Sequence, residues 1–212
     1  MDWLIKTVGT SVGKKLLMAL TGLAFCGFLT AHLAGNLTVY GGADAFNSYA
    51  EHLHSLGPLI TVAELVLLAL FLVHVLTGLV LFVQNLKARP QRYAVDRSAG
   101  GRTVGSRTMP YTGVLILLFI IYHLMNFTFV DKSHTTIFAI VAAAFANPLQ
   151  MFLYIAAVIV VAVHVSHGFW SLFQTFGANH PKYMPAIQAL GLLFAILMGV
   201  GFGFIPLYVA ML

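Results

Sequence analysis

Nine histidines are present in a chain of 212 residues of which 60% are hydrophobic and only 8% are charged. Four of them, His32, His74, His123 and His164, lie deep inside separate apolar stretches. A neutral imidazole has one nitrogen that can bind a transition metal and one N–H that can donate a hydrogen bond. Histidines in such surroundings are therefore candidates for metal ligands, cofactor ligands or proton carriers.

The composition excludes an ordinary soluble enzyme, because a soluble domain carries about 25% charged residues. Unbroken apolar runs of about 20 residues favour membrane-spanning helices over a strand barrel. We predict an all-α integral membrane protein, a single transmembrane domain over residues 1–212. Its five transmembrane helices are expected at residues 16–40, 59–86, 111–130, 149–173 and 186–212. A shorter apolar piece, 135–147, is expected at the interface or as an extension of the fourth helix.

The charges predict an orientation for these helices. Ten of the eleven basic residues lie in the leader, the second connector and the fourth connector, which share one side of the membrane. Only Lys132, after the third span, falls on the other side. By the positive-inside rule the N-terminus is cytoplasmic and the C-terminus is outside. Basic residues confined to short connectors argue against a nucleic-acid partner. The single cysteine, Cys26, excludes a disulfide within the chain and a cysteine-ligated cluster.

Counting residues from the basic ends sorts the four histidines by depth. At 1.5 Å per residue, His32 and His123 share one level, and His74 and His164 share another that is nearer the cytoplasm. Two imidazoles on facing helices can supply both axial ligands of a haem iron. We therefore expect a helix bundle that encloses two haems, with these four histidines as the metal ligands.

The residues around the four histidines bear on the same prediction. Gly78 and Gly168 follow His74 and His164 by four residues and are expected to leave room for a flat ring. For any single histidine, His167 included, the alternative is a hydrogen bond between helices. No internal repeat is apparent in the sequence. Methionine could replace histidine as a ligand, but packing is the favoured role of the candidates Met18, Met125 and Met198.

Two motifs resemble a known family. One runs from His32-Leu33 through the segment Ala-Asp-Ala-Phe-Asn-Ser-Tyr-Ala at 43–50 and on to Glu64 and His74, and the other is His-Val-Ser-His-Gly-Phe-Trp at 164–170. Both are similar to the di-haem cytochrome b membrane-anchor subunit of succinate:quinone oxidoreductases, which comprise succinate dehydrogenases and fumarate reductases. The resemblance implies that His74 and His164 ligate the haem b near the cytoplasm. It also implies that His32 and His123 ligate the haem b near the outside.

The same resemblance implies the function of the chain. It would be the quinone-reactive electron-transfer subunit of an enzyme complex in the bacterial cytoplasmic membrane. Its partners would be a flavoprotein subunit with FAD, an iron–sulfur subunit, and a membrane quinone, expected to be menaquinone near the outer face. Dicarboxylate chemistry would take place on a partner subunit. The basic connector 87–107 offers a docking surface, although the lipid bilayer explains its charges equally well; whether the complex dimerises stays open.

Quinone chemistry also moves protons, and Glu64 is the only acidic residue inside a predicted span. It lies 10 residues before His74, about 15 Å toward the outside, which makes it a candidate for quinone protonation. The alternative is a carboxyl near the interface that bonds to a neighbouring helix, with His52 or His54 nearby.

Two other functions remain as alternatives. One is the cytochrome b subunit of a membrane hydrogenase or formate dehydrogenase, and the other is a proton-coupled membrane transporter. A haem-free anchor is a third possibility. The visible spectrum of the purified protein separates these functions.

Overall fold

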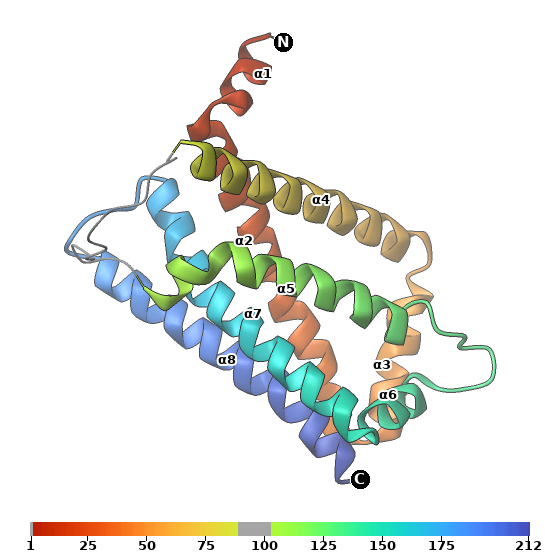
Figure 1. The fold of residues 1–212 in the computed structure, drawn as a ribbon. Coiled ribbons are helices and arrows are strands. Elements are labelled where there is room, and N and C mark those ends of the chain that lie inside the picture. The colour runs from red at the N-terminus through yellow and green to blue at the C-terminus, as the bar shows by residue number, and fades with distance from the viewer. Residues whose placement is uncertain (1, 89–102) are drawn as a thin grey trace.

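The computed structural model describes residues 2–88 and 103–212, and every regular element in them is helical (Figure 1). The five predicted spans are confirmed as helices long and apolar enough to cross a membrane. They are α2 (Ser11–Asn36, continued by the 3₁₀ helix η1, Leu37–Gly41), α4 (Pro58–Lys87), α5 (Val104–Phe127), α7 (Pro148–Thr175) and α8 (Met184–Ala210). The shorter elements are α1 (Asp2–Gly9), α3 (Ala43–Ser55) and α6 (Ile137–Phe145).

Side chains and prolines at the helix starts explain several boundaries. Thr10 and Thr103 accept backbone N–H groups at the first turns of α2 and α5. Asn147 does the same for α7, whose first residue is Pro148. Because Pro148 disfavours helical backbone in the residue before it, α6 ends there and is a separate short helix. The segment 135–147 is therefore not an extension of the fourth span.

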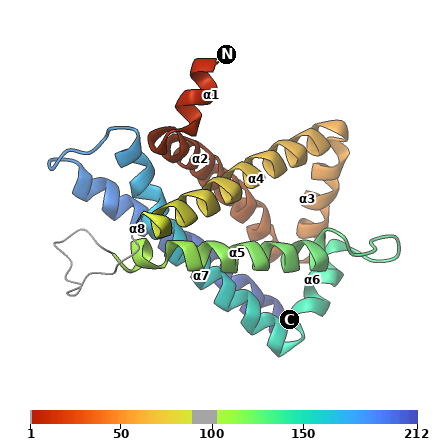
Figure 2. The same cartoon turned by 45° about the horizontal axis from the view of Figure 1, so that its top comes forward.

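The helices pack around a central group of three. Helices α7 and α8 make the most extensive contact, and both also pack against α2. Helix α5 packs against α7, and α4 packs against α2 and makes a smaller contact with α5 (Figures 1 and 2). Small residues allow the close approach of α7 and α8, since a Cβ added at Gly199 would lie 3.1 Å from Cβ of Ala162.

One end of the bundle gathers the starts of α2 and α5 and the ends of α4 and α7. Lys14 Nζ donates to Gln84 Oε1 at 3.1 Å, which joins the start of α2 to the end of α4. Gly105, at the start of α5, packs against His167 of α7. The two chain ends lie at opposite ends of the molecule (Figure 1). Because α2 and α5 start where α4 and α7 end, the four helices that carry the deep histidines alternate in direction, as the depths counted from the basic ends require.

The other end of the bundle holds a hydrophobic cluster and two short helices. Val39 of η1 is fully buried there among side chains from α3, α6, α7 and α8. The N–H of Phe138 in α6 donates to Asn47 Oδ1 of α3 at 3.0 Å. Helix α3 falls in a connector for which the hydrophobic pattern predicted no helix.

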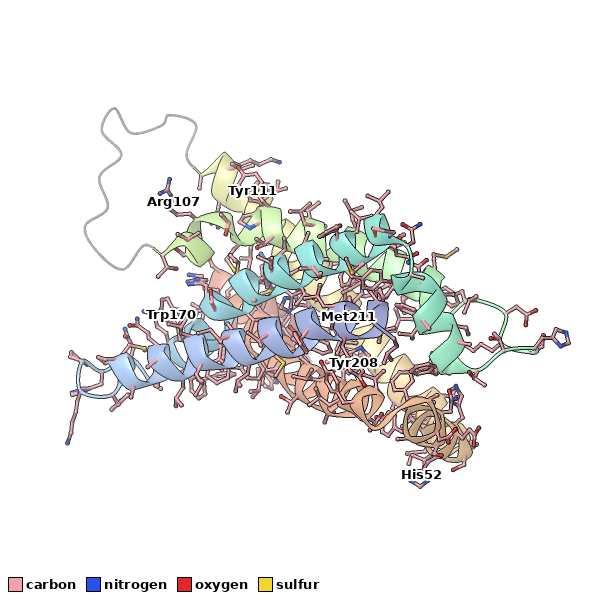
Figure 3. All side chains as sticks on the ribbon, turned by 90° about the horizontal axis from the view of Figure 1, so that it is seen from below. His52, Arg107, Tyr111, Trp170, Tyr208 and Met211 are labelled. Atoms are coloured by element: carbon pink, nitrogen blue, oxygen red, sulfur yellow. The ribbon has the colours of Figure 1, made fainter. Side chains whose placement is uncertain are left out.

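The outer surface is apolar along the long helices. No residue in the most apolar part of α4 is buried inside the molecule, and leucines such as Leu65 and Leu76 are more than half exposed. A soluble monomer rarely exposes so much contiguous apolar surface, so this exterior is consistent with a multi-pass membrane protein. Figure 3 shows Arg107 and Trp170 toward one end of the bundle and His52 toward the other.

Candidate histidine site in the helix bundle

The structure brings His32 of α2 and His123 of α5 together. Their ring centroids are 6.0 Å apart and their planes are almost perpendicular, at 89°. Both side chains are half-buried. Aromatic rings enclose the pair on several sides, those of Phe28, Phe119, Phe127, Tyr154 and Phe202.

The separation of these two imidazoles suits a shared metal ion. A metal–imidazole bond of about 2 Å, and a ring nitrogen about 1 Å from the ring centre, give about 6 Å between two rings that share one ion. Buried Nδ1 of His123 has no hydrogen-bond partner among the described residues, and a buried polar atom in that state needs an explanation. The donor set, two neutral imidazoles in an apolar enclosure, is the kind that holds a haem iron.

The other two deep histidines each contact a threonine on a neighbouring helix. Nδ1 of His74 in α4 lies 2.8 Å from Oγ1 of Thr21 in α2. Nδ1 of His164 in α7 lies 2.9 Å from Oγ1 of Thr112 in α5. The same side-chain pair therefore occurs twice, once between α2 and α4 and once between α5 and α7.

Glycines lie beside both of these imidazoles. A Cβ added at Gly22 would lie 3.8 Å from Cε1 of His74, and one added at Gly113 would lie 3.6 Å from Cε1 of His164. Within the described part of the chain, the ring contact between His32 and His123 is the one contact between two histidine rings.

These matching pairs reveal a repeat that composition and hydrophobic periodicity did not indicate. The pattern Thr-Gly, five residues, Phe, three residues, His-Leu begins at Thr21 and again at Thr112, 91 residues later. The pattern Val-His-Val, two residues, Gly contains His74 and again His164, 90 residues later. Each copy supplies a long helix, a short helix and a second long helix, so the expectation of no repeat was wrong. The repeated positions lie around the four deep histidines.

The glycines that follow the ligand candidates differ in their surroundings. A Cβ at Gly168 would meet nothing within 4 Å, so space is open beside His164. A Cβ added at Gly78 would lie 3.6 Å from Cε of Met18. Two of the three methionine candidates are accounted for by position, since Met198 is buried in the hydrophobic cluster and Met125 is exposed.

Glu64 lies in the first two turns of α4, at the end of the bundle that holds α3 and α6. Its side chain is exposed on the apolar exterior, and no contact with the deep histidines is seen. His52 and His54 are in the last turn of α3 and are also exposed. Neither His52 nor His54 forms a hydrogen bond with Glu64 in the described part of the chain.

Two remaining expectations concern the end of the bundle where α5 begins and α7 ends. Four arginines of the basic connector lie outside the described residues, Arg89, Arg92, Arg97 and Arg102. His167 packs through Cβ against Gly105, and its ring meets that of Trp170 edge to face at 4.8 Å. The packing of His167 on Gly105 joins α5 to α7, but buried Nδ1 of His167 has no hydrogen-bond partner among the described residues, so the expected hydrogen bond between helices is not seen there.

Sequence reasoning did not find Thr21 and Thr112, or Tyr154 and Phe202. The repeated Thr-Gly pair was the available signal for the threonines, whereas nothing in the local sequence marks the two aromatic residues. Comparisons of the chain with protein-family models, with curated proteins and with solved structures found no match. The resemblance to a family therefore stands on the motifs alone.

Proposed function

We propose that the chain is the membrane-anchor cytochrome b subunit of a succinate dehydrogenase or fumarate reductase. In this role it carries electrons between a membrane quinone and iron–sulfur and flavin subunits on the cytoplasmic side. The observation that supports this most strongly is the arrangement of four deep histidines. One pair is in ring contact at 6.0 Å, and the members of the other are each held by a threonine at 2.8 Å and 2.9 Å.

Two haem b groups fit the residues that are present. His32 and His123 would hold one of them, and His74 and His164 the other, through neutral imidazole nitrogens. When bound, haem supplies reversible one-electron oxidation and reduction of iron. The chain contributes the ligands, their orientation and a dry, low-dielectric enclosure.

The two histidine levels are separated along the helices. Thr21 and Thr112 each lie 11 residues before the histidine on their own helix, about 16 Å at 1.5 Å per residue. The pair His74 and His164 is therefore nearer the end where the basic connectors begin. The positive-inside rule makes that end cytoplasmic, which is where soluble electron-transfer partners would dock.

Quinone oxidation and reduction also require a group that accepts and releases protons. Glu64 is the candidate in this chain, because it is a carboxyl within the apolar length of α4 at the end remote from the basic connectors. Its exposure on the helix exterior would let a quinone reach it laterally from the lipid. Protons released there would leave on the outer side.

Haem stoichiometry in single variants tests the ligand assignment. The wild type should contain two b haems per chain. His32→Ala and His123→Ala should each remove the same haem, and His74→Ala should remove the other. His180→Ala, in an exposed connector, is the control and should retain both. A colourless wild type would support a transporter or a haem-free anchor and would refute the proposal.

Turnover in Glu64→Gln tests the proton role separately. The variant should retain both haems and lose quinol oxidation, whereas Glu51→Gln, at an exposed position of α3, should keep wild-type turnover. Normal turnover in Glu64→Gln would remove this carboxyl from the mechanism. Flavin that copurifies with the wild-type complex would favour the proposed flavoprotein partner over a hydrogenase or formate dehydrogenase.

A further inference from the structure

Two threonines are the buried aliphatic hydroxyl side chains among residues 2–88 and 103–212. Thr21 is 3% exposed and Thr112 is 7% exposed, whereas the other described buried residues are aliphatic, aromatic, methionine or glycine, and the buried Tyr154 hydroxyl accepts from Asn126. A buried hydroxyl is costly unless it is hydrogen-bonded. Each of these hydroxyls contacts a deep histidine, so burial and contact single out the same two positions independently.

The hydrogen-bond partners of the threonines determine which way the histidine bond runs. The Thr21 hydroxyl donates to the carbonyl of Leu17 at 2.7 Å, one turn earlier in α2. The Thr112 hydroxyl donates to the carbonyl of Thr108 at 3.0 Å, one turn earlier in α5. A hydroxyl has one proton and two lone pairs. With the proton directed at the carbonyl, each threonine oxygen is left as an acceptor.

The histidine nitrogen in each pair must then be the donor. On this assignment Nδ1 of His74 and Nδ1 of His164, at 2.8 Å and 2.9 Å from the threonine oxygens, would carry the proton and donate it. A neutral imidazole has only one N–H, so Nε2 of both rings is left with a free lone pair. This is the tautomer that a metal ligand requires, because a ligating histidine donates its other N–H to a fixed acceptor.

We propose that Thr21 and Thr112 are positioning residues that fix the tautomer and ring direction of His74 and His164 as ligands of one cofactor. The proposal rests on the proposed function and adds two residues to it. Each threonine contacts its histidine from another helix of the same repeat, so equivalent contacts would orient the two ligands.

The pair His32 and His123 has no equivalent support. Asn36 donates mainly to the carbonyl of His32, at 2.8 Å, and its amide nitrogen is 3.5 Å from Nδ1 of that ring. Nδ1 of His123 has no partner in the described residues. Loss of a threonine should therefore alter one haem and leave the other unchanged, and the second haem serves as an internal reference.

The experiment compares Thr21→Val and Thr112→Val with Thr21→Ser and Thr112→Ser in the complete complex. Valine keeps the side-chain volume and removes the acceptor, whereas serine keeps the hydroxyl. Thr30→Val and Thr108→Val are matched controls on the same two helices, because these hydroxyls contact only carbonyls of their own helix. The measurements are haem content, the electron paramagnetic resonance spectrum of each oxidised haem, and its midpoint potential.

Each valine variant should weaken retention of the haem held by His74 and His164 by about 10- to 100-fold, the usual effect of losing an acceptor behind a ligand. The retained fraction should show altered resonance positions and a raised midpoint potential, because the imidazole becomes a weaker donor. The serine variants and both controls should match the wild type, and the haem of His32 and His123 should not change in any of them.

The outcomes separate this proposal from the function on which it rests. A wild type without haem overturns both. Two haems in the wild type together with unchanged spectra and potentials in the valine variants overturn the threonine role alone. The threonine role is also overturned if serine fails to restore the wild-type spectrum, or if both haems change equally, since either result would indicate a general packing defect.

Discussion

Replacement of Gly105 by alanine tests whether the packing of α5 on α7 positions the site. A Cβ at Gly105 would lie 2.8 Å from Cβ of His167, 3.1 Å from the carbonyl oxygen of Val163 and 3.2 Å from Oγ of Ser166. The carbonyl oxygen of Val163 is part of the α7 backbone and Cβ of His167 is bonded directly to it, so neither atom can rotate away. Because carbon atoms pack at about 3.5–4.0 Å, α5 must move away from α7 by about 1 Å.

This displacement has two expected consequences. Overpacking of this kind costs typically about 1–3 kcal/mol of stability. Thr112 lies two turns after Gly105 on the same face of α5, so the 2.9 Å contact between Thr112 and His164 would lengthen beyond hydrogen-bonding distance. Gly105→Ala should therefore lower the free energy of unfolding and also change the spectrum of the haem that His164 is proposed to hold.

The assay is denaturant or thermal unfolding of the detergent-solubilised protein, followed by absorption spectroscopy of the same samples. Gly27→Ala in α2 is the matched control, because a Cβ there would meet nothing within 4 Å. The control should be neutral or stabilising by up to about 1 kcal/mol, the helix preference of alanine over glycine. Equal stability and equal spectra for the two variants would refute the proposed effect of helix packing on the site.

Three further predictions concern separate parts of the molecule. Gly168→Leu should reduce the content of the haem proposed to be held by His164 in reduced-minus-oxidised spectra, because its side chain would enter open space beside that residue; full haem content would contradict this. Asn47→Ala should cost about 1 kcal/mol and speed hydrogen exchange in α6, because the N–H of Phe138 loses its acceptor; unchanged exchange would show that the contact is dispensable. The pKa of Asp131 should lie below its usual 3.8, because the backbone N–H and hydroxyl of Ser133 donate to the carboxylate. The turn at Asp131–Ser133 is therefore stabilised at neutral pH, and it loses this stabilisation as the pH falls through the lowered pKa of Asp131. An NMR titration of Asp131 with a midpoint at or above 3.8 would contradict the assignment.

The five spans could be predicted from the sequence because each needs only length and continuous apolar character, which are local properties. The structure extends the first, second and fourth spans by a few residues at their ends, whereas the third both starts and ends earlier than predicted. The start of α5 is at Val104, earlier than the predicted residue 111. Polar residues such as Ser106 and Arg107 open this helix, and they weaken the apolar signal without breaking the helix.

Residue counting placed His32 level with His123, and the structure has these rings in contact. Counting succeeds here because the rise per residue is fixed and the ends of the helices are marked by charge. It gives depth but not the rotation of a helix about its axis. For that reason it could not show that Thr21 faces His74 or that Thr112 faces His164.

Helix α3 and the repeat were missed for a related reason. Helix α3 (Ala43–Ser55) is polar and short, and its stability comes from contacts such as that of Asn47 with α6, which connect distant parts of the sequence. The repeat is confined to the residues around the four histidines, since lipid accepts almost any apolar side chain at the other positions. The equivalent threonine contacts draw attention to the two copies, which the sequence patterns around the histidines also show.

An experimental density map of the purified protein, in a membrane or in detergent, tests the two-haem assignment most directly. We expect flat density with a metal at its centre between His32 and His123. We expect a second such feature between His74 and His164, with Thr21 and Thr112 behind the two rings. Imidazoles turned toward lipid, or no density for a metal and a flat ring between the members of either pair, would contradict the assignment.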